Sequence, residues 1–244
     1  VQLSPPSLSD LRADAERVQE ALLQQHGVHC RRVDIDVLRD LSAQLRSWNW
    51  QAQVSLRGDE WIALNPWPSG QLGLAIDLGT TKVAGYLVDL ETGRTLASQG
   101  LMNPQIVYGE DVITRITGAR EGPAEAKRMQ KLAVEALNQL AVGLCAEVGA
   151  RPQEIVEAVV VGNTAMHHLL LCLPVEQLAL SPYVPAVRQA LDVKARDIEL
   201  DIAAGAYVHL LPNIAGFVGA DHVAMLLAVE AAKSKGLALA LDIG

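Results

Sequence analysis

One short pattern occurs twice in this chain, as LGLAIDLG at residues 72–79 and as LALALDIG at residues 237–244. Five of the eight positions are identical, and both copies run from apolar residues into Asp, an aliphatic residue and Gly. Such a run is typical of a buried strand that ends in a turn. The second copy falls where a repeat of the intervening unit would begin. We therefore expect one lobe at 71–236 and, at 237–244, the first strand of a second lobe in a longer protein.

The residues between the two copies follow strand and helix patterns in the order βββαβαβα. Three strand-like runs, LGLAIDLG, KVAGYLVD and RTLASQGLM, are joined by the turns GTT and LETG, which predicts an antiparallel meander. Apolar residues at helical spacing follow Pro123, and Gly149 ends that helix. Next come a strand IVEAVVVG, a short helix TAMHHLLL, a strand VHLLPNI and a helix ADHVAMLLAVEAAKSKG. This order predicts an α/β lobe.

The composition changes sharply near residue 70. All four tryptophans precede it, whereas every lysine and every tyrosine follows it, and the turn-rich NPWPSG lies at the change, at 65–70. Upstream, two segments with apolar residues at helical spacing precede two strand-like runs that meet at Gly58 and Asp59. We expect residues 1–70 to form a separate small α+β domain.

The net charge of -8 and the pI near 5.2 argue against nucleic acid or an anionic membrane as a partner. No apolar run approaches the roughly 20 residues that a membrane span needs. Cys30, Cys145 and Cys172 are widely spaced and form no CxxC pair, which favours buried thiols in a reducing compartment over a disulfide or zinc framework. We expect a cytoplasmic protein.

The turn DLGTTK carries the chemistry that the sequence offers most clearly. Gly79 allows the main chain to approach a ligand closely, and the hydroxyls of Thr80 and Thr81 add hydrogen bonds, so the turn suits a phosphate. Asp77 would then hold a magnesium ion, through water, and Lys82 adds positive charge. The alternative is a plain hairpin, because Asp, Gly and Thr are favoured in turns for local reasons. Neither GxxxxGK[ST] nor a GxGxxG that opens a helix is present.

Several segments resemble a known group of proteins. DLGTTKVAGYLVDLETG resembles the first phosphate motif of the actin, sugar-kinase and DnaK-type chaperone superfamily, and DIG resembles the start of its second. NPQIVYGEDVITRI, GNTAMHHLLL and LPNIAGFVGADHVA are similar to the ATPase domain of reductive activators of corrinoid proteins. The first seventy residues resemble the middle domain of those activators.

The resemblance implies a ribonuclease H-like, actin-type ATPase lobe with a mixed five-stranded sheet and helices on both faces, preceded by the small domain. It also implies roles for particular residues. Asp77 and Asn213 would be catalytic, with Asn213 near the γ-phosphate. The residues implied to bind the nucleotide phosphates are Gly79, Thr80, Thr81, Lys82, Asp242 and Gly244. Asn213 is open to a second interpretation, in which it only caps or satisfies a loop.

The activity implied by the resemblance is the ATP-driven reduction of a Co(II) corrinoid to Co(I) on the corrinoid protein of a methyltransferase system. ATP with Mg is the implied cofactor, and a [2Fe-2S] cluster is expected in the parent protein, although this chain lacks the four cysteines of a plant-type cluster. Two alternatives stay open. One is a small-molecule kinase of the same fold, and the other is a non-catalytic docking or dimerisation scaffold. The oligomeric state stays open as well, with a homodimer as one alternative.

Two further pairs of residues are open to a simple structural interpretation. Asp111 and Arg115 stand at i and i+4, which predicts a helical ion pair. His167 and His168 are adjacent on a helix and point about 100° apart, which predicts one buried and one exposed histidine rather than a metal site.

Overall fold

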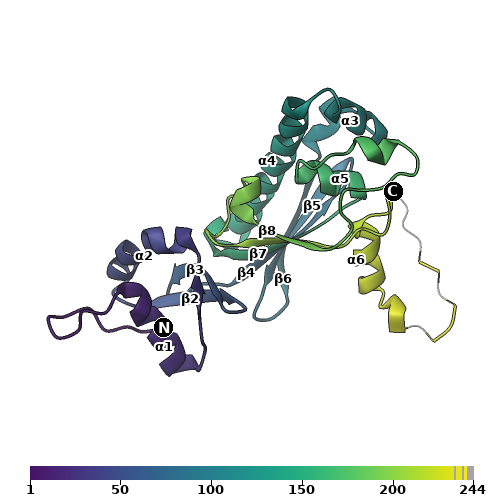
Figure 1. Cartoon of the computed structure of the whole chain (residues 1–244). Coiled ribbons are helices and arrows are strands. Elements are labelled where there is room, and N and C mark those ends of the chain that lie inside the picture. Colours follow the sequence, from purple (N-terminus) through teal and green to yellow (C-terminus); the bar gives the residue numbers. More distant parts are fainter. Residues whose placement is uncertain (234, 238, 241–244) are drawn as a thin grey trace.

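The computed structural model describes residues 1–233, 235–237 and 239–240. Figure 1 shows a small domain that carries the N terminus beside a larger lobe built on one sheet. The expected strand at 237–244 falls largely on residues outside the described ones. The domain boundary at residue 70 stays a prediction.

The small domain packs two helices on a three-stranded sheet. Its elements are α1 (Asp14–His26), β1 (Arg32–Val33), α2 (Ile35–Ser47), β2 (Ala52–Arg57) and β3 (Glu60–Pro66). The strand order is β1-β3-β2, and β2 and β3 form the hairpin predicted around Gly58 and Asp59. Helix α1 ends at Gly27, whose φ of 68° is a left-handed conformation that glycine adopts at little cost. Trp61 and Leu45 lie at the centre of the core.

The lobe contains six strands in the described residues. They are β4 (Leu72–Leu78), β5 (Lys82–Asp89), β6 (Thr95–Met102), β7 (Ile155–Val161), β8 (Leu191–Lys194) and β9 (Tyr207–Leu210). The order is β6-β5-β4-β7-β9-β8, in which β4, β7 and β9 are parallel while β5, β6 and β8 run antiparallel to their neighbours. The prediction of five strands missed β8. That edge strand has only four residues, two of them charged, and so has no apolar run to mark it.

Most helices of the lobe lie on one face of this sheet, and α6 lies on the other. The α-helices of the lobe are α3 (Val112–Ala119), α4 (Pro123–Val148), α5 (Thr164–Leu170) and α6 (Ala220–Ala228). The 3₁₀-helices are η1 (Pro104–Tyr108), η2 (Pro152–Glu154), η3 (Glu176–Ala179), η4 (Ala195–Ile198) and η5 (Ala231–Lys233). Figure 1 shows α3, α4 and α5 above the sheet and α6 at its far end, on the other side.

Helix α4 makes the main contact with the sheet. Gly85 of β5 lies under it, and a Cβ there would already lie 3.2 Å from Leu144 and 3.3 Å from Leu140. This glycine therefore lets the helix approach closely. The helix ends at Gly149 in a left-handed conformation, as the sequence predicts.

The last described helix is shorter than predicted. The pattern predicts a helix through residue 236, but α6 ends at Ala228, because Glu230 takes a positive φ of 49° before η5 begins.

The small domain and the lobe share both apolar and ionic contacts. Ile62 and Ala63 of β3 belong to the apolar core of the lobe. Arg57 of β2 pairs with Asp192 of β8 at 2.7 Å and with Glu157 of β7 at 3.4 Å. These contacts join the β2–β3 hairpin to three strands of the larger sheet, since Glu60 of β3 also accepts a hydrogen bond from Tyr207 of β9.

A buried carboxylate lies at the centre of this interface. The carboxylate of Asp34 pairs with the ammonium of Lys194 and with the guanidinium of Arg196, both at 2.8 Å. Lys194 also pairs with Glu60 at 2.8 Å. Burial would raise the pKa of Asp34, but hydrogen bonds from Arg196 and Lys194 outweigh it, so the pKa is lowered. The network therefore holds Asp34 as a carboxylate between the two domains.

Among the helices in the described part of the chain, none has the length and apolarity to cross a bilayer.

Candidate functional site

Three loops meet at one edge of the sheet of the lobe. Because β4, β7 and β9 are parallel neighbours, their carboxyl ends lie together, with the ends of β4 and β9 about 10 Å apart. The loops that follow these strands cover residues 79–81, 162–163 and 211–219. Ligands of open α/β sheets bind outside such carboxyl ends, at strands where the direction of connection changes. This edge is therefore the candidate site.

The turn at 79–81 is held by its carbonyl groups. The Nδ2 of Asn103 donates to the carbonyl oxygen of Gly79 at 2.8 Å, and the main-chain N–H of Asn103 donates to that of Thr81 at 2.9 Å. The guanidinium Nη2 of Arg115 donates to the carbonyl oxygen of Thr80. A trans peptide group points its N–H opposite to its C=O. The N–H groups of Thr80 and Thr81 therefore point away from Asn103 and Arg115.

Asn163 joins the second loop to this turn. Its Nδ2 donates to the hydroxyl oxygen of Thr80 at 3.0 Å, while its Oδ1 accepts from the N–H of Met166 at 3.0 Å. The residue is thus the N-cap of α5 and a partner of the turn at the same time.

Asp77 and Lys82 lie on the sheet face opposite α4. On β4, Ile76 and Leu78 are buried, so the exposed Asp77 between them points to the other face. Asp77 is opposite Ala84 on β5, and the exposed Lys82 lies two residues before Ala84, on the same face. The structure thus brings the carboxylate, the turn and the lysine to one edge. Their roles in binding Mg²⁺ and phosphate stay predictions.

Two glycines bring the loops into contact. A Cβ on Gly162 would lie 2.6 Å from the carbonyl oxygen of Leu78, and a Cβ on Gly219 would lie 2.5 Å from the Cα of Asn163. Both neighbours are main-chain atoms, which cannot move aside without moving the loops. The N–H of Ala220, the first residue of α6, donates to the carbonyl oxygen of Gly162 at 2.9 Å. Helix α6 therefore begins at this edge, where its N terminus favours negative charge.

Asn213 lies in the third loop with an unusual side-chain environment. The residue is 5% exposed, and its main-chain N–H donates to the carbonyl oxygen of Arg188 at 2.8 Å. Its side-chain Oδ1 and Nδ2 are both buried and have no hydrogen-bond partner among the described residues. An unsatisfied buried amide costs about 1–3 kcal/mol, and a ligand or water would remove that cost. The catalytic role of Asn213 stays a prediction, and Asp242 and Gly244 lie outside the described residues.

The predicted ion pair between Asp111 and Arg115 was wrong. Asp111 is the N-cap of α3, where its Oδ1 accepts from the N–H of Thr114 at 2.8 Å. Arg115 is fully buried and donates to Thr80 and, through Nε at 3.0 Å, to the carbonyl oxygen of Gly109. The i, i+4 rule applies to side chains that both lie on a helix surface, and here one of them points into the core.

The prediction of one exposed histidine was also wrong, since His167 and His168 are both buried. The Nδ1 of His168 bonds to the carbonyl oxygen of Thr164 at 2.7 Å, and its Nε2 accepts from the N–H of Ala186 at 3.1 Å. Burial, and then the neighbouring His168, lower the pKa of His167 to about 4. The short helix α5 is covered on all sides, so adjacent positions are both enclosed.

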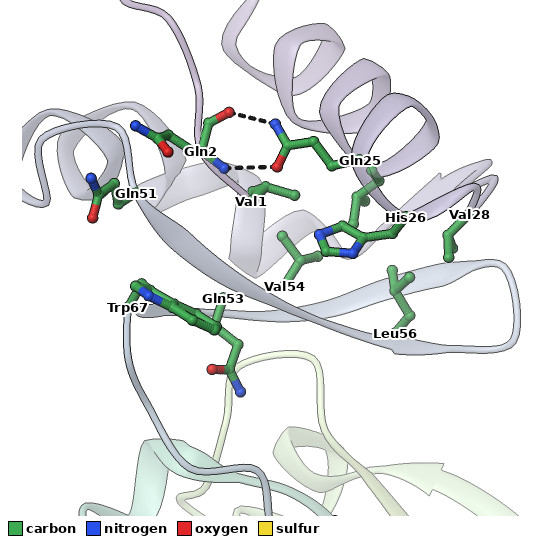
Figure 2. A pocket seen from close by; sticks show the side chains of 11 residues that line it. Val1, Gln2, Gln25, His26, Val28, Gln51, Gln53, Val54, Leu56 and Trp67 are labelled. Carbon is green, nitrogen blue, oxygen red and sulfur yellow. Dashed lines mark hydrogen bonds between the residues drawn. The ribbon is translucent and has the colours of Figure 1, made fainter.

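A groove of about 580 Å³ lies elsewhere, on the small domain. Figure 2 shows the amide of Gln25 bonded twice to the main chain of Gln2 on one side, and the ring of Trp67 on another. The remaining lining residues are Val1, Leu22, His26, Val28, Gln51, Gln53, Val54 and Leu56. The lining is mostly apolar and amide, with no carboxylate, so the groove lacks the charged groups that meet at the sheet edge.

The fold and this edge define the class of protein: the lobe has the mixed α/β fold of an actin-like ATPase lobe. The family model described as the RACo middle region matches residues 72–234, and the model described as the RACo linker region matches residues 1–69. The chain belongs to the RACo family. In that family's terms, the domain that we expected to be the middle domain is the linker region, and the lobe is the middle region.

Two relatives describe this similarity further. The chain is 36% identical over 172 residues to the corrinoid activation enzyme RamQ of Eubacterium limosum, which covers 70% of this chain and 29% of RamQ. A solved structure, a reductive activator for corrinoid, iron-sulfur protein, has 34% sequence identity and a TM-score of 0.76, over 96% of this chain and 38% of that one. The chain therefore spans well under half the length of either relative.

Proposed function

We propose that this chain works in the ATP-dependent reduction of a corrinoid cofactor from Co(II) to Co(I), on the corrinoid protein of a methyltransferase system in the cytoplasm. The main structural support for a phosphate-binding site is the turn at 79–81. Its carbonyl groups accept hydrogen bonds from Asn103 and Arg115. Its N–H groups are left on the other side, where an anion can bind. Membership of the RACo family and the printed names of the two relatives support the corrinoid partner.

In this proposal the turn binds the phosphates of ATP. The N–H groups and hydroxyls of Thr80 and Thr81 donate to phosphate oxygens, and Lys82 contributes charge. Asp77 holds Mg²⁺ through water, which suits an exposed carboxylate beside a phosphate site. Asn213 uses its side-chain amide, which has no partner in the described part of the chain, near the γ-phosphate. Bound ATP supplies the free energy that makes an uphill electron transfer possible.

The residues of this chain do not fit an iron-sulfur cluster. Cys145 is buried within the lobe core, Cys172 is exposed and Cys30 lies in the small domain, so the three thiols do not form one site. A plant-type cluster needs four cysteine ligands. We propose that the electron comes from a [2Fe-2S] cluster held by other residues of the parent protein.

The test uses the protein as its gene encodes it, mixed with a Co(II) corrinoid protein, an electron donor and Mg-ATP. The formation of Co(I) is followed by its optical spectrum. Asp77→Ala should abolish the ATP-dependent part, whereas Asp201→Ala, at an exposed aspartate of the same lobe, should leave it unchanged.

Two results would replace the proposal. Phosphoryl transfer from ATP to a sugar or polyol hydroxyl would favour the kinase alternative. Unchanged Co(I) formation after Asp77→Ala would favour the scaffold alternative, in which the turn has no nucleotide role.

A further inference from the structure

Arg115 is a buried cation that has no carboxylate partner in the part of the chain that the structure describes. Its side chain is 0% exposed, and no ion pair among the described residues includes it. Besides the carbonyls of Thr80 and Gly109, its partners within the described part of the chain are weak ones, Gln105 Oε1 at 3.4 Å and Met166 Sδ at 3.3 Å from Nη1. An uncompensated buried charge is costly, and buried arginines are ordinarily paired. This cost calls for an explanation.

Arg115 does not avoid this cost by losing its proton. A guanidinium stays protonated in proteins. Burial lowers the pKa of Arg115, and the distant charge of Asp111 only partly opposes this. Asp111 itself is engaged as the N-cap of α3. The local environment therefore disfavours the cation, and an added negative charge nearby would stabilise it.

The geometry relates this charge to one peptide group of the phosphate turn. Arg115 donates to the carbonyl oxygen of Thr80, and the N–H of the same peptide group belongs to Thr81. Because the peptide group is planar and trans, that N–H points away from the guanidinium, toward the opposite side of the turn. A cation on the carbonyl polarises the peptide group and makes its N–H a stronger donor. The buried charge of Arg115 thus strengthens the hydrogen bond that the N–H of Thr81 can donate to a ligand on the opposite side of the turn.

We propose that Arg115 is a positioning residue that fixes the Thr80 peptide group and supplies, from behind the turn, the positive charge that a polyphosphate neutralises. The ligand class is the polyphosphate of a nucleoside triphosphate, so the inference rests on the proposed function. Arg115 does not touch the ligand in this arrangement. It acts through the main chain of the turn, and α3 places the residue behind it.

The test compares a variant that keeps the charge with one that keeps a donor. Arg115→Lys keeps the charge but loses the planar fork, and Arg115→Gln keeps an amide donor but loses the charge. Arg120→Met is the matched control, because it removes one exposed guanidinium at the end of the same helix. Calorimetric titration of each variant of the protein as its gene encodes it, with Mg-ATP and separately with adenosine, gives the affinities.

We expect Arg115→Gln to weaken the binding of Mg-ATP about 30-fold and that of adenosine less than about 3-fold, in line with the loss of one preorganised electrostatic partner. Arg115→Lys should stay within about 5-fold of the original protein, and Arg120→Met within about 2-fold. Hydrogen exchange without nucleotide should be faster at Thr80 and Thr81 in Arg115→Gln.

Other outcomes separate the two proposals. If Lys and Gln weaken ATP binding equally, or if adenosine is lost in proportion to ATP, Arg115 is only a structural residue and the inference is overturned. If both variants fold and bind ATP as the original protein does, it is overturned as well. If the original protein binds no ATP, or if Asp77→Ala leaves ATP binding unchanged, the proposed function itself fails and the inference fails with it.

Discussion

The ionic contact between the two domains predicts a large effect for one small change, Asp34→Asn. The side chain of Asp34 is 2% exposed and lies 2.8 Å from both Lys194 and Arg196. Asparagine has the same shape and is an equally good N-cap, so α2 keeps its first turn. The change removes the negative charge between the two cations and replaces one of the two acceptor oxygens with an NH2 donor.

The size of the effect follows from the partners that remain. Losing one member of a buried ion pair costs about 3–5 kcal/mol, because an unpaired charge is left behind. Here Lys194 keeps Glu60 at 2.8 Å and Arg196 keeps Asp36 at 3.1 Å, so neither cation is left alone. We therefore expect a loss near the value for a hydrogen bond to a charged group, about 2 kcal/mol. Asp34→Ala should cost about 1 kcal/mol more, because it also removes the cap.

Urea unfolding followed by tryptophan fluorescence measures this loss, because all four tryptophans lie in or next to the small domain. Asp59→Asn is the control, since Asp59 pairs with Arg32 at an exposed site and should change stability by no more than about 0.5 kcal/mol. A difference at pH 7 as small as that of the control would refute the reasoning, because the interface would then not depend on its charges.

The pH dependence gives an independent check. The folded-state pKa of Asp34 is lowered, so its contribution is fully present above the unfolded value of about 3.9 and is lost as the pH falls through the folded value. The difference between Asp34→Asn and the original protein should be constant from about pH 5 to pH 8 and should shrink below about pH 4. A difference that grows on acidification would contradict the assignment.

Three further outcomes are expected. Gly219→Ala should lower the free energy of unfolding in urea by about 3 kcal/mol, because the added Cβ would clash with the main chain of Gly162. Backbone strain does not contribute, since the φ of -104° suits alanine. A neutral result would mean that the loops separate easily. Asn103→Ala should cost about 2–4 kcal/mol and weaken ATP binding, since the buried N–H of Gln105 and the partly buried carbonyl of Gly79 lose their partner. A loss of stability with unchanged ATP affinity would remove the link to the turn. Iodoacetamide at pH 8 should alkylate the exposed Cys172 at least about 100-fold faster than the buried Cys145, whose pKa is raised to about 11 by burial. Mass spectrometry of peptides measures both rates. Equal rates would show that the lobe core opens.

The parts of the fold that the sequence predicts are those with a local signal. Helix α4 has 26 residues with one apolar face and a glycine stop, and the three strands of the meander are separated by turns. Strand β8 has no such signal. Its position in the sheet depends on long-range contacts, because Asp192 and Lys194 form ion pairs with residues more than a hundred positions earlier in the chain. The early end of α6 has no clear mark either, since the residues after Ala228 are good helix formers.

The residues of the candidate site were likewise predicted only where the sequence has a local signal. The turn at 79–81 is visible in the sequence because its residue types have turn and phosphate chemistry. Asn103, Arg115 and Asn163 were missed, although each bonds to that turn from 22 to 83 positions away. Arg115 shows why, because its spacing from Asp111 suggested a surface pair. Only packing decides which face of α3 is buried, and a pattern of single residues does not contain that information.

The small domain contacts the lobe along several strands of its sheet. It is attached covalently to β4 through residues 66–71, by ion pairs to β7 and β8, and by a hydrogen bond from Tyr207 of β9. Contacts to four strands of one sheet oppose rotation of the domain relative to that sheet. For an arm roughly 25 Å long, a rotation of the lobe by about 10° would carry the far end of the domain by about 4 Å. These contacts would therefore couple a rotation of the lobe to a larger displacement at the outer surface of the small domain.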